Sequence, residues 1–151
     1  LARNQISNNG LQDLAGLNIL VELDLSDISQ LSDDGLQHLS GLTSLSKLNL
    51  WRVPVSDPGV EYLKTLVNLK WLNLDNTQLS DDGLTALVDM KKLTFLHLGS
   101  TQVSDTGLKH LSALTSLQDL KVTRTAVTET GVTELKISLP ETEIQLEYLD
   151  K

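Results

Sequence analysis

Acidic residues recur at one position of the sequence, at intervals close to 24 residues: Asp33 or Asp34, Asp57, Asp81, Asp105 and Glu129. Carboxylates in a regular row are the groups that bind metal ions or carry out acid–base chemistry. Asp57, however, precedes Pro58, and proline is favoured at the first position of a helix. We therefore interpret these acids as helix N-caps, whose charge suits the positive end of the helix, rather than as a metal or acid–base array.

The other candidates for chemistry are the histidines: His38, His97 and His110. His38 and His110 fall at equivalent positions on the outer surface of predicted helices, exposed to solvent and without facing acids. His97 lies between an amide and an amine in its predicted column, which is a poor metal environment. Asp75 is in diagonal reach of His97, but no serine completes a catalytic triad. The sequence therefore predicts no catalytic residue, no metal site and no cofactor, and the chain is not expected to be an enzyme.

The repeated acids and the histidines belong to a repeated sequence unit. Residues 69–90, LKWLNLDNTQLSDDGLTALVDM, show this unit best. Units begin near residues 20, 45, 69, 93 and 117, after a partial unit at 1–19, and the first full unit is one residue longer. Leucines that alternate with polar residues, as in Leu72-Asn73-Leu74, predict a strand with one buried face. Apolar residues spaced by three, such as Leu84, Leu87 and Met90, predict a short α- or 3-10 helix. Stacking of such units would bury their leucines in one continuous core.

A glycine follows each acidic position: Gly35, Gly59, Gly83, Gly107 and Gly131. Glycine serves where backbone or side chains approach closely, or where the backbone adopts dihedral angles that other residues avoid. None of these glycines is followed by the Lys-Ser/Thr pair of a phosphate-binding loop. We interpret them as structural positions.

The consensus L-x-x-L-x-L-x-x-T-x-[VL]-[ST]-[DE]-x-G-[LV]-x-x-L resembles the leucine-rich repeat family over essentially the whole chain. The SDxGL turn is most similar to bacterial arrays and to the cysteine-containing class, although the cysteines of that class are absent. The resemblance implies an α/β fold: a curved right-handed solenoid with a parallel sheet on its concave face and short helices on its convex face. It also implies binding of macromolecules, usually proteins, and favours a location outside the cytoplasm.

Composition narrows the partner class. The net charge of −8 and the pI near 4.7 argue against nucleic acid, whose affinity rests on Lys and Arg. The same charge argues against anionic membrane surfaces, and no apolar run approaches the ~18 residues that would span a bilayer. The expected partner is therefore a protein or peptide.

Aromatic residues predict where that partner binds. Four of the five Trp, Tyr and Phe residues lie at sheet positions that a leucine core does not need: Trp51, Trp71, Phe95 and Tyr148. Aromatic and arginine side chains are enriched among interface hot spots. We therefore predict a concave binding patch centred on Trp71 and Phe95, which comprises Trp51, Arg52, Trp71, Asn73, Phe95, His97, Lys121 and Arg124. The alternatives are that the aromatics only shield the sheet, and that the array is a structural spacer in a larger protein.

The two ends of the chain differ from the repeats between them. Leu1 aligns with the second strand leucine of a unit, so the chain is expected to be the C-terminal part of a longer array. Its N-terminal end would then expose apolar core and allow self-association. After Pro140, residues 141–148 predict a final capping strand, whose outward glutamates discourage edge-to-edge pairing.

Overall fold

The computed structural model describes residues 1–147, and in these residues strands alternate with short helices. The strands are β1 (Glu22–Asp24), β2 (Lys47–Asn49), β3 (Trp71–Asn73), β4 (Phe95–His97), β5 (Asp119–Lys121) and β6 (Glu143–Gln145). The helices are α1 (Asn8–Leu11), η1 (Gln12–Leu14), α2 (Asp33–Leu36), η2 (Gln37–Leu39), α3 (Asp57–Glu61), η3 (Tyr62–Thr65), η4 (Asp82–Leu87), α4 (Asp105–Leu108), η5 (Lys109–Leu111) and α5 (Glu129–Ser138).

The strands form one parallel sheet in the order β1-β2-β3-β4-β5-β6, so each pairs with its neighbours in the sequence. Equivalent residues of successive units pair, and Leu72 lies beside Leu96. The strand leucines form a buried column: Leu23, Leu48, Leu72, Leu96 and Leu120. The prediction of stacked coils that share a leucine core is confirmed.

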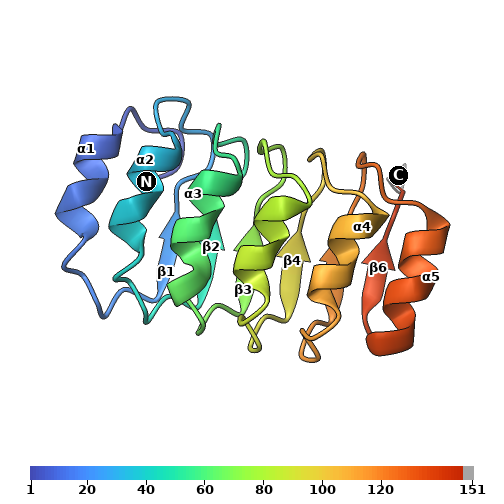
Figure 1. The fold of residues 1–151 in the computed structure, drawn as a ribbon. Helices are drawn as coiled ribbons and strands as arrows, with labels where there is room; N and C mark the ends of the chain where they lie inside the picture. Colours follow the sequence, from blue (N-terminus) through green and yellow to red (C-terminus); the bar gives the residue numbers. More distant parts are fainter. Residues whose placement is uncertain (148–151) are drawn as a thin grey trace.

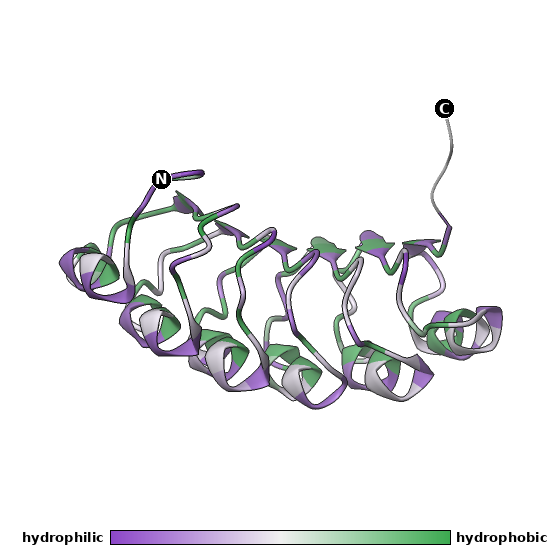
Figure 2. Cartoon of the chain, turned by 90° about the horizontal axis from the view of Figure 1, so that it is seen from above, coloured by the Kyte–Doolittle hydropathy of each residue, from purple (hydrophilic) through white to green (hydrophobic). Residues whose placement is uncertain are grey.

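The molecule has two layers, with all the helices on one side of the sheet (Figure 1). Seen from above, the helices follow the outer side of a shallow arc and the strands follow the inner side, with apolar residues facing into the space between them (Figure 2). The other face of the sheet is not covered by helices. Side chains that alternate with the strand leucines therefore stand on an open, concave surface.

A tight turn follows each of the strands β1 to β5, and a matching turn lies near the start of the chain. The residue two places after the unit's second apolar strand position, a leucine or a valine, has a left-handed backbone, with φ between 54° and 58°: Arg3, Asp27, Arg52, Asn76, Ser100 and Arg124. The threonine that follows closes three of these turns. The hydroxyls of Thr77, Thr101 and Thr125 donate to the carbonyls of Leu74, Leu98 and Val122 at 2.8, 2.6 and 2.6 Å. A repeated turn of one geometry brings each helix back to the same side of the sheet.

The repeated acids lie at or next to the N-cap positions, as predicted, and Asp81 is itself at the N-cap of η4, but in the described helices none of them caps a helix with its side chain. Asp57 is the first residue of α3, and the N-cap is Ser56. The carboxylate of Asp57 instead reaches the next coil, where it accepts the backbone N–H of Ser80 at 2.8 Å and its hydroxyl at 2.5 Å. A carboxylate has two oxygens, so it can satisfy both donors of one serine at once, which an N-cap interaction within one coil would not achieve.

The same contact recurs along the stack and forms a ladder of hydrogen bonds between coils. Its rungs are Asn8–Ser32, Asp33–Ser56, Asp57–Ser80, Asp81–Ser104 and Asp105–Thr128. We call this set the Asp–Ser ladder. The first rung uses an amide, whose Oδ1 accepts from the Ser32 backbone while its Nδ2 donates to the Ser32 hydroxyl.

The regular spacing of the glycines follows from this ladder. A Cβ at Gly59 would collide with Oδ1 of Asp33 and would lie 3.0 Å from the Asp33 Cα. None of the chain's glycines, all of which lie in the described part, has a positive φ. The close-approach interpretation of these glycines is thus confirmed, and the special-dihedral alternative does not apply.

The last coil departs from the others. Its helix, α5, is a regular α-helix of 10 residues, whereas η4 is entirely 3-10. The final strand spans only Glu143–Gln145, shorter than the predicted 141–148, and Tyr148 lies outside the described residues. At the other end, Leu17, Ile19 and Val21 are 45%, 84% and 52% exposed.

The ladder predicts a dependence of stability on pH. Hydrogen bonds from the backbone and hydroxyl of Thr128 lower the pKa of Asp105 below its ordinary value of 3.8; the Gly131 N–H and Lys109 add to this, against the opposing effect of burial. A carboxyl group whose pKa is lower in the folded than in the unfolded chain stabilises the fold at pH values above its ordinary pKa. That contribution is lost as the pH falls through the lower, folded pKa.

Asp105→Asn should therefore be less stable than the parent at neutral pH, and its free energy of unfolding should fall less steeply between about pH 5 and pH 2. Urea unfolding at a series of pH values measures both effects. Asp13→Asn, which removes an exposed acid from η1, is the charge-matched control and should keep the parent's slope. The prediction would be contradicted if the free energy of unfolding of Asp105→Asn fell with pH as steeply as that of the parent.

Candidate functional site

The centre of the concave sheet face is a stacked pair of aromatic rings. Trp71 of β3 and Phe95 of β4 are paired residues on adjacent strands. Their ring centroids are 4.9 Å apart and the ring planes differ by only 5°. Both side chains are half-buried. Because the helices lie on the other side of the sheet, the open part of this pair faces outward from the concave surface.

Two lysines flank the pair. Nζ of Lys47, on β2, lies 5.1 Å from the Trp71 ring centroid, and Nζ of Lys121, on β5, lies 5.6 Å from the Phe95 ring centroid. Both distances suit cation–π attraction. Trp71, Phe95, Lys47 and Lys121 therefore form one unit, here called the aromatic stack, whose ring edges are the part most available to a partner.

His97 adjoins the aromatic stack. Its ring meets Phe95 edge to face, with centroids 6.4 Å apart and planes at 74°. Burial lowers the pKa of His97 below its ordinary value of 6.5; Lys121 acts in the same direction, while Asp75 and Asp119 oppose it. His97 is therefore neutral at pH 7, and one of its ring nitrogens can accept a hydrogen bond.

A second contact lies at the turn after β2. The guanidinium of Arg52 lies 5.2 Å from the Trp51 ring centroid. Arg52 also pairs with Asp27 at 3.3 Å, and Arg3 approaches the same carboxylate at 3.9 Å. The ion pairs are solvent-exposed and add little to stability. Their effect is to orient Arg52 along the edge of the concave face.

The structure brings some predicted site residues together and separates others. Trp71, Phe95, His97 and Lys121 form one continuous group, and Trp51 with Arg52 forms another. Asn73 is half-buried and engaged in its own turn, since its Oδ1 accepts the Asp75 backbone N–H at 2.9 Å.

Four other side chains lie outside these groups or differ from the prediction. Arg124 is exposed in the turn after β5. Sequence reasoning missed Lys47, although its place beside Trp71 in the same column was a usable signal. His38 and His110 are half-buried rather than solvent-exposed as predicted, because their short helices pack edge to edge along the stack.

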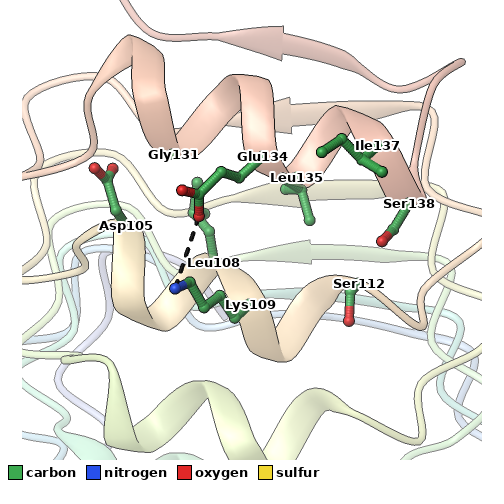
Figure 3. Close-up of a pocket in the computed structure, with 9 residues that line it drawn as sticks. All are labelled: Asp105, Leu108, Lys109, Ser112, Gly131, Glu134, Leu135, Ile137 and Ser138. Carbon is green, nitrogen blue, oxygen red and sulfur yellow. Dashed lines mark ion pairs between the residues drawn. The ribbon is translucent and has the colours of Figure 1, made fainter.

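The convex side has a groove between α4–η5 and α5, with a volume of about 370 Å³ (Figure 3). Leu108 and Leu135 line it, and Lys109 pairs with Glu134 across it at 3.7 Å. The groove marks the change from short helices to the longer α5. It shares no residue with the predicted concave patch.

A family model described as "Leucine rich repeat" matches residues 43–103. The chain has the fold of a leucine-rich repeat solenoid. No curated protein matched its sequence.

Among solved structures, an internalin C2 from Listeria monocytogenes is similar over 97% of this leucine-rich repeat chain, with a TM-score of 0.83 and 26% identity. A second internalin from the same species covers 99% of the chain at 18% identity and a TM-score of 0.52, which shows the fold alone. The leucine-rich repeat chain spans 59% and 53% of the lengths of these two proteins. Its fold is an internalin-like solenoid of six parallel strands and short helices.

Leucine-rich repeat domains are typically non-catalytic. Among residues 1–147, no group of three or more His, Cys, Asp or Glu side chains is arranged to hold a metal ion. In the same residues, no helix is both long and apolar enough to cross a membrane. The features left to explain are those of the concave face.

Proposed function

We propose that the chain is a protein-interaction module that binds a protein or peptide through its concave face, with the aromatic stack at the centre of the contact. It acts without catalysis of its own. The observation that supports this most is the parallel stacking of Trp71 on Phe95, half-buried, on the sheet face that no helix covers.

Binding through these rings would cost little conformational entropy and would gain free energy from their burial. Large aromatic side chains on an exposed sheet are not needed by a core of leucines. Held in a rigid stack, they lose little further conformational freedom when a partner covers them. Buried aromatic anchors contribute most of the energy of typical interfaces. The surrounding Lys47, Lys121 and Arg52 would then form a polar rim that selects a partner by charge.

The test removes the centre of this surface. Trp71→Ala combined with Phe95→Ala should weaken partner binding by about thirtyfold or more, because truncation of a hot-spot residue costs about 2 kcal/mol or more. Proteins captured on the immobilised parent chain would be identified by quantitative mass spectrometry. The affinity of the purified partner for each variant would then be measured by calorimetry.

The matched control removes apolar surface from the convex side. Tyr62 and Val67 are 40% and 41% exposed there, so Tyr62→Ala with Val67→Ala should leave partner affinity unchanged. Equal affinity of the parent and of a folded Trp71→Ala/Phe95→Ala variant would refute the proposal. In that case the spacer role would be the better account.

A further inference from the structure

The two rings of the aromatic stack present their edges, and not their faces, to a partner. Trp71 and Phe95 cover each other's inner faces, since their centroids are 4.9 Å apart and their planes differ by 5°. The strands β2 and β5 lie on the two outer sides of this pair. From there Nζ of Lys47 lies over the Trp71 ring at 5.1 Å from its centroid, and Nζ of Lys121 over the Phe95 ring at 5.6 Å. Each half-buried ring therefore leaves its edge to solvent.

Ring edges and ring faces select different ligands. A guanidinium group or a nucleic-acid base binds flat on an aromatic face, and here it would first have to displace a lysine. The edge of an aromatic ring carries the positive part of the ring quadrupole, whereas the face carries the negative part. A group that matches two adjacent ring edges must therefore present electron density to them.

The neighbouring charges distinguish between the groups that present electron density. Glu22 pairs with Lys47 across β1 and β2, and Asp119 pairs with Phe95 across β4 and β5. These carboxylates would repel a carboxylate of the partner, which would also lose its hydration on entering the interface. The face of a neutral aromatic ring carries electron density without a net charge, so it avoids both costs.

We infer that the protein partner is anchored by an aromatic side chain, Phe, Tyr or Trp, whose ring lies flat across the edges of Trp71 and Phe95. This deepens the proposed function and rests on it. Edge-to-face ring pairs have centroids about 4.5–7 Å apart. One guest ring centred above the 4.9 Å gap satisfies that distance to both rings at once. The chain already contains one such contact, between His97 and Phe95, with centroids 6.4 Å apart and planes at 74°.

The experiment uses the full chain and a random peptide library displayed on phage. The library is selected on the parent chain and depleted on the Trp71→Ala/Phe95→Ala variant, so that the remaining peptides depend on the aromatic stack. Their affinities are then measured by calorimetry on synthetic peptides. We expect each peptide to contain one aromatic residue whose replacement by alanine weakens binding by about thirtyfold or more, as for an interface hot spot.

A double-mutant cycle then isolates the contact between rings. Cyclohexylalanine has nearly the shape and apolar area of phenylalanine but no π face. In place of the anchoring residue it should lower affinity for the parent by about twofold to tenfold, the usual contribution of an aromatic pair. Trp71→Leu/Phe95→Leu keeps an apolar centre without rings and should bind both peptides alike. Tyr62→Ala/Val67→Ala, on the convex side, should discriminate between them like the parent.

NMR reports on the geometry of the same complexes. The outward edge protons of Trp71 and Phe95 would lie over the face of the guest ring, where the ring current shifts proton signals upfield. We expect this upfield shift with the aromatic peptide and not with its cyclohexylalanine counterpart.

Four outcomes would overturn the inference: a library that yields no peptide dependent on the aromatic stack, dependent peptides that require Asp, Glu, Lys or Arg in place of an aromatic residue, equal affinity of the parent for the aromatic and cyclohexylalanine peptides, or the same ratio of affinities in Trp71→Leu/Phe95→Leu. The readout separates the two proposals. If the natural partner needs the aromatic stack but the selected peptides need no aromatic residue, the anchor inference is wrong and the concave interface stands. If the aromatic peptides behave as expected but the partner binds Trp71→Ala/Phe95→Ala like the parent, the interface proposal is wrong.

Discussion

Gly59→Ala is expected to lower the free energy of unfolding by about 2–4 kcal/mol, more than a single methyl group normally costs. The added Cβ would meet Oδ1 of Asp33, the oxygen that accepts the Ser56 backbone N–H at 2.7 Å. The Asp33 Cα would be only 3.0 Å away, so backbone as well as side chain would have to move. The substitution thus adds volume and breaks a hydrogen bond between coils.

Urea unfolding followed by circular dichroism measures this effect. The matched control is Gly16→Ala, because nothing lies within 4 Å of a Cβ at Gly16. That variant should keep the stability of the parent to within a few tenths of a kcal/mol, or gain slightly from the reduced freedom of the unfolded chain. Equal stabilities of Gly59→Ala and Gly16→Ala would show that the close approach at Gly59 carries no energetic weight.

The second large effect is expected at Asp81. Its carboxylate accepts the Ser104 backbone N–H at 2.7 Å and the Ser104 hydroxyl at 2.6 Å. Asp81→Ala would leave both donors without a partner inside the stack. Each unsatisfied donor costs about 1–3 kcal/mol, and we expect a total loss of about 2–4 kcal/mol in unfolding free energy.

Asp81→Asn is the informative companion, because the first rung of the ladder already uses an amide. Asn8 accepts from the Ser32 backbone and donates to the Ser32 hydroxyl. Asp81→Asn can adopt that arrangement and should lose about 1 kcal/mol or less. Asp82→Asn, at the exposed neighbouring position, should have no measurable effect. If Asp81→Ala had the same free energy of unfolding as the parent, water would replace the carboxylate without cost.

These effects should be local to neighbouring coils of the stack. In a solenoid each coil contacts only its neighbours, so stability is close to a sum of coil and interface contributions. The Asp–Ser ladder is one such interface contribution, on the helix side of the stack. The paired strands provide the other. A broken rung at Asp81 would thus weaken the boundary between two coils.

The candidate site was predicted in part. Alternation along the strands was enough to place Trp71, Phe95, His97 and Lys121 on one open face, because side-chain direction in a strand follows sequence parity. The lysine contacts with the aromatic rings depend on side-chain rotamers, which spacing does not determine.

The repeated coil, the parallel strands in register and the leucine core could be predicted from the amino-acid pattern, because they follow from the period of apolar residues and from the need to bury them together. The role of the repeated acids, in contrast, became clear from the stacked coils. An N-cap and a bond to the next coil both call for a small acidic residue at the start of a helix, so one sequence position fits both. The distance to Ser56, Ser80 and Ser104 of the following coil distinguishes them, and that distance exists only once the coils have stacked.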